Sequence, residues 1–179
     1  MYYFTADTHL GHGNIIHHCQ RPFASLEQMD ETLIGNINEM VGPDDTLWIL
    51  GDFAWKEPKK YLTYIYCKHI HILQGNHDHP NQLSKAVFGL MGKGVDIILE
   101  PSIVDMKIDL QRITLCHYPM LSWRASHYGT WHLFGHVHGN LKHPSPHAID
   151  VGVDVNEFTP VSWDTVQEKI EENLCLPRS

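Results

Sequence analysis

Residues 46–52 read Thr-Leu-Trp-Ile-Leu-Gly-Asp, and residues 69–78 read His-Ile-His-Ile-Leu-Gln-Gly-Asn-His-Asp. In both stretches a short apolar run leads to a glycine, which is followed by side chains that can bind a metal ion. Three more apolar runs lead to residues of the same kind: Tyr2–Ala6 before Asp7, Arg112–Cys116 before His117, and Trp131–Phe134 before Gly135-His136. In an open α/β sheet, ligands gather beyond the carboxyl ends of the strands. Five such runs can therefore bring distant residues to one point.

The composition is that of a globular protein. A chain of 179 residues with 42% apolar residues can bury a sizeable core, so we expect one domain over residues 1–179. The formal charge of −8 argues against a broad basic surface for nucleic acid. The four cysteines stand far apart in sequence, without a C-x-x-C pair, and isolated thiols fit a reducing cytosol.

The N-terminal segment enters a strand-like run at Tyr2, so we expect no secretory leader. We also find no apolar stretch near the ~18 residues that a membrane span needs. These features predict a cytoplasmic protein without a membrane partner.

The periodicity of apolar residues predicts the main elements. Ser25-Leu26-Glu27-Gln28 has the form of a capping box at the start of a helix, and Pro160-Val161-Ser162 opens a second helical pattern. Shorter helices are expected at 81–88 and 59–66, and an antiparallel hairpin at 103–116. Alternating strands and helices followed by a strand-rich half predict a layered α/β sandwich with mixed sheets.

Three of the five strand ends are weak signals when each is taken alone. Asp7 and His9 are two residues apart, so both can turn toward one ion at a strand end. Asp52 follows its run as a single carboxylate that can bridge two cations. His117 is a lone histidine, a type that more often belongs to a core or a loop.

Two motifs are more specific. In Gly75-Asn76-His77-Asp78 the glycine permits a sharp turn, and an amide, an imidazole and a carboxylate follow it. Asn76 would offer its carbonyl oxygen as a neutral ligand, which leaves His77 free for proton chemistry. Gly135-His136-Val137-His138-Gly139 places two imidazoles in one turn between glycines, and it is the strongest single motif.

In this order the five motifs resemble those of the calcineurin-like metallophosphoesterase family, over residues 7 to 138. The resemblance implies an αββα sandwich that holds two divalent metal ions. One ion would be bound by Asp7, His9, Asp52 and His138, and the other by Asp52, Asn76, His117 and His136. Manganese is the first expectation, with iron, zinc, nickel or cobalt as alternatives, because mixed nitrogen and oxygen ligands suit several metals.

The resemblance also implies the reaction. Two cations ~3.5–4 Å apart would generate a metal-bound hydroxide that attacks a phosphodiester, or alternatively a phosphomonoester. His77 would protonate the leaving oxygen, and Asp78 would orient His77. The expected partner is a small phosphoester, with nucleotides included, rather than a nucleic acid held on a basic face.

Three residues after the first motif are candidates for substrate binding: His12, Asn14 and Arg21. The alternative for His12 and Asn14 is a solvated loop, and the alternative for Arg21 is a structural salt bridge.

Other functions are compatible with parts of the pattern. The chain could be a non-catalytic metal-binding scaffold of the same fold, or a nuclease acting on short single-stranded nucleic acid. A single-metal enzyme with two histidines and one carboxylate would leave at least four of the matched residues unexplained.

Overall fold

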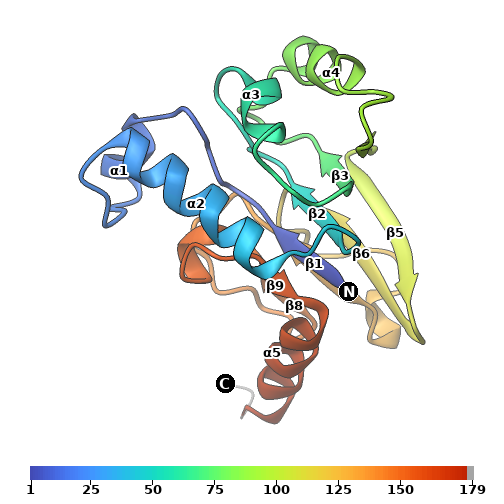
Figure 1. The fold of residues 1–179 in the computed structure, drawn as a ribbon. Coiled ribbons are helices and arrows are strands. Elements are labelled where there is room, and N and C mark those ends of the chain that lie inside the picture. The colour runs from blue at the N-terminus through green and yellow to red at the C-terminus, as the bar shows by residue number, and fades with distance from the viewer. Residues whose placement is uncertain (177–179) are drawn as a thin grey trace.

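The computed structural model describes residues 1–176, which form two mixed β-sheets and flanking helices (Figure 1). The first sheet has the strand order β4-β3-β2-β1-β9. Its strands are β1 (Tyr2–Thr5), β2 (Thr46–Leu50), β3 (His69–Leu73), β4 (Asp96–Leu99) and β9 (Val161–Ser162). The first four are parallel, whereas β9 pairs antiparallel with β1.

The second sheet has the order β5-β6-β7-β8. Its strands are β5 (Ile103–Ile108), β6 (Gln111–Cys116), β7 (Trp131–Phe134) and β8 (Ala148–Asp150). β5 and β6 form the predicted antiparallel hairpin, and β6, β7 and β8 run parallel.

The register places the carboxyl ends of neighbouring strands side by side. Thr5 at the end of β1 pairs with Ile49, and Leu50 at the end of β2 pairs with Leu73 of β3. In the second sheet, Leu115 pairs with Leu133 close to the ends of β6 and β7. The loops that follow β1, β2 and β3 therefore leave one edge of the first sheet together, as do those after β6 and β7 in the second.

The helices are α1 (Asn14–His18), α2 (Leu26–Met40), α3 (Pro58–Leu62), α4 (Pro80–Phe88) and α5 (Trp163–Cys175), and two 3₁₀ turns cover Ser126–Tyr128 and Val153–Val155. The buried face of α2, with Met29, Leu33 and Ile37, packs in one core with Leu47 of β2 and Ile70 of β3. This core fills the space between the helices and the first sheet.

A second core lies between the two sheets. Phe4 and Leu50 from the first sheet meet Leu115 and Leu133 from the second, all of them almost fully buried. The buried stripe of α5, led by Trp163, joins this core at the edge where β9 and β8 lie (Figure 1). The predicted layered α/β sandwich is thus confirmed.

Local sequence signals explain the helix boundaries. Ser25 is the N-cap of α2 and accepts a hydrogen bond from the Gln28 amide at 3.2 Å, as the capping box predicts. The helix expected from Pro160 begins only at Trp163, because Val161 and Ser162 first pair with β1. The helix expected at 59–66 covers only Pro58–Leu62. No helix in the described residues is both long and apolar enough to cross a membrane.

Candidate metal centre

The loops after β1 and β2 run together, and they carry three of the predicted ligands. The Asp7 amide donates to the Gly51 carbonyl at 3.1 Å, and the His9 amide donates to the Asp52 carbonyl at 2.9 Å. These backbone bonds hold Asp7, His9 and Asp52 in adjacent turns. All three residues are almost fully buried, which is unusual for charged and polar side chains without a partner or a metal ion.

Six of the seven predicted ligands come together in two groups, each of which can hold a metal ion. One group is Asp7, His9 and His138, and the other is Asp52, His117 and His136. Within each group, one ligand atom from every residue lies within 4.8 Å of the others. Asp52 lies between the groups, because its Oδ2 is 3.5 Å from His9 Nε2 and also 3.5 Å from His117 Nε2.

Several buried polar atoms of the first group have no hydrogen-bond partner within the described residues. They are Asp7 Oδ1 and both ring nitrogens of His9. Burial raises the pKa of Asp7 to about 7 and lowers the pKa of His9 to about 3, so burial disfavours the charged form of each. An unpaired carboxylate oxygen beside a neutral imidazole is a donor set that a divalent cation would satisfy.

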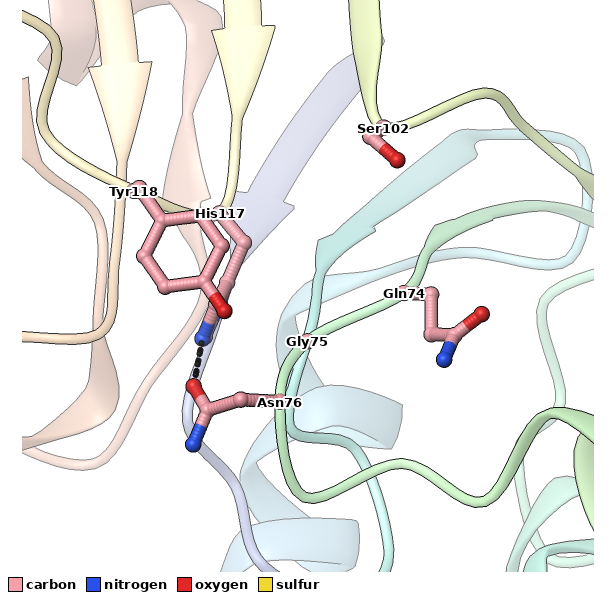
Figure 2. Close-up of a pocket in the computed structure, with 6 residues that line it drawn as sticks. All are labelled: Gln74, Gly75, Asn76, Ser102, His117 and Tyr118. Atoms are coloured by element: carbon pink, nitrogen blue, oxygen red, sulfur yellow. Dashed lines mark hydrogen bonds between the residues drawn. The ribbon is translucent and has the colours of Figure 1, made fainter.

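In the second group, acceptor atoms face one another. His117 Nδ1 lies 2.8 Å from the Leu50 carbonyl, so this nitrogen carries a proton and Nε2 is the nitrogen that faces the group. His117 Nε2 lies 3.1 Å from Asn76 Oδ1 (Figure 2) and 3.5 Å from Asp52 Oδ2. Three acceptors directed at one point require a cation between them, which is a proton or a metal ion.

The pKa shifts of His117 and Asp52 also indicate that the second group attracts a cation. Burial alone would disfavour the His117 cation, but the Asp52 and Asp7 carboxylates outweigh burial and raise the pKa of His117. Burial would likewise raise the pKa of Asp52, and the His117 imidazole reverses this and lowers it to about 2. The second group therefore attracts positive charge, and its residues fit a metal ion.

A buried network holds His138. Its Nδ1 lies 2.7 Å from Asp154 Oδ2, which leaves Nε2 free for a metal ion. The Arg21 guanidinium binds Asp154 through Nε and Nη2, both at 2.8 Å. Its Nη2 and Nη1 also donate to the backbone carbonyls of Asp7 at 2.7 Å and Thr8 at 3.1 Å.

This network corrects the expected substrate-binding role of Arg21. Its side chain is fully buried and its donors are engaged inside the protein, so the salt bridge is the alternative that the structure shows. Asp154 was not predicted. A signal for it exists, because residues 148–154 again form a short strand followed by a glycine and an aspartate.

The ligand loops are tightly packed and strained. Five of the seven predicted ligands, Asp7, His9, Asp52, His136 and His138, have φ between +48° and +73°. For residues other than glycine, this left-handed backbone conformation costs on the order of 1–3 kcal/mol each, and such residues cluster at functional sites. At Gly135 a Cβ would lie 2.6 Å from Asp7 Oδ2, and at Gly75 it would collide with the Asp52 carboxylate. Glycine is therefore required where these motifs approach the carboxylates.

Asp78 and His77 occupy different environments. The Asp78 carboxylate is buried. It accepts hydrogen bonds from the backbone amides of Asp52 at 2.8 Å, Phe53 at 3.0 Å and Gly75 at 2.9 Å. Among the described residues, none of its hydrogen bonds goes to the His77 ring. His77 is exposed; its amide donates to Asp52 Oδ1 at 2.8 Å, and its ring centroid lies 5.3 Å from that of His9.

The other two candidates for substrate binding, His12 and Asn14, lie in different environments. The His12 ring stacks on Trp55, with centroids 4.5 Å apart and an interplanar angle of 14°, and it lies 6.2 Å from His77. His12 and Trp55 form one wall beside the first metal group. Asn14 begins α1 and is exposed, and within residues 1–176 its side chain makes no hydrogen bond to the site.

Comparisons with known proteins relate the chain mainly to uncharacterised ones. No family model matches. The chain is 29% identical to the uncharacterised protein MJ1445 of Methanocaldococcus jannaschii, over 97% of this chain and 93% of that protein. It resembles the crystal structure of AQ665, a protein of unknown function from Aquifex aeolicus, with a TM-score of 0.72 and 25% identity over 94% and 98% of the two chains. A weaker likeness, with a TM-score of 0.47 and 14% identity over 84% and 77%, is to YfcE, a phosphoesterase from E. coli.

Proposed function

We propose that the protein is a calcineurin-like phosphoesterase that uses two divalent metal ions to hydrolyse a phosphodiester. The observation that carries the proposal is the pair of ligand groups that meet at Asp52. Buried atoms without partners in one group and facing acceptors in the other support a cation in each. The reaction class is proposed from the order of the motifs along the chain, which resembles that of the calcineurin-like metallophosphoesterases.

Metal ions bound by the two ligand groups would supply an activated water and would neutralise the charge that develops on the phosphoryl group. The chain supplies the position and the protons. Asp52, which lies between His9 and His117, would be a ligand of both ions, and His117 and Asn76 would help to hold the second. His77 extends its exposed ring beside His9, where it can donate a proton to the leaving oxygen.

We assign Asp78 a positioning role. Its carboxylate connects the loop after β3 to the loop after β2 through backbone amides, so it fixes Asp52 relative to Asn76 and His77. The proposed proton donor is thus held mainly through its own backbone, whose amide binds Asp52.

The ligand set includes imidazoles, carboxylates and an amide oxygen. Such a mixture suits manganese and also accepts iron, zinc, nickel or cobalt. We propose manganese as the first metal to test.

Hydrolysis of bis-p-nitrophenyl phosphate tests the function directly. Purified protein is stripped with EDTA and reloaded in parallel with manganese, cobalt, nickel or zinc, and release of p-nitrophenol is measured. We expect turnover with at least one metal and none after stripping. A matched control is Asp44→Asn, because Asp44 is exposed and far from the ligand loops, whereas Asp52→Asn should be inactive. Absence of turnover with all four metals would contradict the proposal.

A further inference from the structure

A polar pocket of about 300 Å³ opens beside the second metal group (Figure 2). It is lined by Gln74, Gly75, Asn76, Ser102, His117 and Tyr118. Asn76 and His117 therefore border both this pocket and the proposed metal centre. The Tyr118 ring rests 5.0 Å from the His117 ring and 4.7 Å from the His136 ring, measured between centroids. A phosphoryl group held by a metal ion at Asp52 and His117 would therefore have this pocket on one side.

The chemistry of the pocket favours a neutral, hydroxyl-bearing group. Figure 2 shows Tyr118 beside His117 and Asn76, with Ser102 and Gln74 across the opening. Tyr118 offers a phenol and Ser102 a hydroxyl, whereas Gln74 offers its amide Oε1, because its Nε2 donates to the Asp78 carbonyl at 3.4 Å. No Lys, Arg, Asp or Glu among the described residues lines the pocket. A second phosphate would meet no cation there, and an ammonium group would meet no anion.

The opposite side of the centre has a different character. The stacked rings of His12 and Trp55 lie beyond His9, and Trp55 is also 5.6 Å from His77. Asp52 stands between His9 and His117, so the aromatic wall and the polar pocket flank the point where phosphorus would bind. Two unlike walls on either side of one phosphorus fit a diester with two unlike substituents.

We infer that the pocket lined by Gln74, Ser102 and Tyr118 binds the retained, hydroxyl-bearing alcohol of a phosphodiester, such as a glycerol or sugar ester. The inference rests on the proposed function. His77, the proposed proton donor, lies on the side of Trp55, so the leaving alcohol occupies that side. Water forms the new P–O bond, the P–O bond to the leaving alcohol breaks, and that alcohol departs with a proton from His77, which is reprotonated by the solvent. The product is the phosphomonoester of the alcohol in the polar pocket.

Two substrates with the same leaving group separate this inference from simple phosphodiesterase activity. Glycerol p-nitrophenyl phosphate carries hydroxyls on the retained side, and methyl p-nitrophenyl phosphate does not. We expect the wild-type protein to show a higher kcat/KM for the glycerol ester. Because one neutral hydrogen bond corresponds to about a fivefold effect, Ser102→Ala and Gln74→Leu should each lower the ratio of the two kcat/KM values about fivefold.

The matched controls are Ser84→Ala and Gln82→Leu on α4, which make the same chemical changes at exposed positions outside the pocket. Both should keep the wild-type ratio. A ratio within twofold of wild type in Ser102→Ala and in Gln74→Leu would overturn the inference.

A binding measurement distinguishes failure of this inference from failure of the proposed function. Calorimetric titration of the manganese-loaded protein with glycerol 3-phosphate and with methyl phosphate requires no turnover. Tighter binding of glycerol 3-phosphate, reduced in Ser102→Ala, would support the pocket even if no ester were hydrolysed. Equal affinity for the two phosphates would overturn the inference even in an active enzyme.

Discussion

Asp52 and His77 are neighbours across two loops, but they are expected to respond differently to substitution. Asp52→Asn removes the charge between the two ligand groups and should impair both ions, so we expect metal content and turnover to fall together. His77→Ala should keep most of the metal and lower the rate on the order of 10²–10⁴-fold, the usual contribution of a proton donor. Metal analysis of the purified variants, together with the bis-p-nitrophenyl phosphate assay, tests both. Equal metal loss in the two variants would contradict the role given to His77.

We predict that Asp154 acts on the metal centre through His138, whose ring it holds. Asp154→Asn removes the carboxylate that fixes the His138 ring, so metal affinity should fall about 10- to 100-fold. It also leaves the buried Arg21 guanidinium without its counter-ion, which should lower the free energy of unfolding by about 3 kcal/mol.

Two measurements check the Asp154 prediction. Metal titration gives the affinity, and urea denaturation of the metal-free protein gives the stability. The control Asp164→Asn changes an exposed aspartate in the first turn of α5; it should keep the metal affinity and lower the free energy of unfolding by no more than about 1 kcal/mol. Loss of stability with unchanged metal affinity would show that Asp154 acts only on the fold.

At the level of single residues, the sequence predicted the metal ligands that directly follow a strand. Asp7, Asp52, His117 and His136 each follow an apolar run at once, or after a single glycine, so their convergence follows from the parallel register. The sequence left the role of Arg21 open between a salt bridge and a phosphate ligand. Only its burial against Asp154, 133 positions away, distinguishes the two. Such long-range pairings leave no local signal in one sequence.

Elements with strong local signals were predicted, and those that depend on neighbours were not. The caps and the apolar stripe define α2, and alternation defines the β5–β6 hairpin. β9 has only two residues and exists because it pairs with β1. β4 is a four-residue edge strand with mostly exposed side chains, so no alternation between buried and exposed positions marks it.

The N-cap of α2 offers a test at the scale of one element. Ser25→Ala removes the acceptor for the Gln28 amide and should lower the free energy of unfolding by about 1 kcal/mol. Ser25→Asn keeps an acceptor at this position and should cost little. Urea denaturation of the three proteins checks this, and an equal loss in both variants would contradict a capping role.

The stability of the whole molecule should fall in mild acid, partly because of His132. This residue is fully buried in β7; its Nδ1–H donates to the Thr114 carbonyl at 3.0 Å and its Nε2 accepts the Met120 amide at 3.1 Å. Burial lowers the pKa of His132 from 6.5 to about 4. Protonation of His132 is disfavoured in the folded state. The free energy of unfolding therefore keeps its full value above pH 6.5 and decreases by ~3 kcal/mol as the pH falls toward 4.

Urea denaturation in EDTA at several pH values measures this decrease. His132→Gln retains an amide donor and acceptor but does not titrate, so its stability should change less between pH 6.5 and 4 than that of the wild type. The other titratable groups are the same in both proteins, so their contributions cancel in the comparison. Parallel pH profiles for the two proteins would contradict the assignment.

The antiparallel strand β9 carries a consequence for how the protein is made. One edge of β1 stays unpaired until Gly152 bridges Ala6 and residues 161 and 162 pair with Tyr3 and Phe4, and α5 then covers the neighbouring core. During synthesis, the edge that leads to Asp7 therefore stays open until residues 152–162 have emerged from the ribosome. An open strand edge is a template for pairing with another chain. A nascent chain stalled before residue 152 should thus be more prone to aggregation than a chain that includes β9.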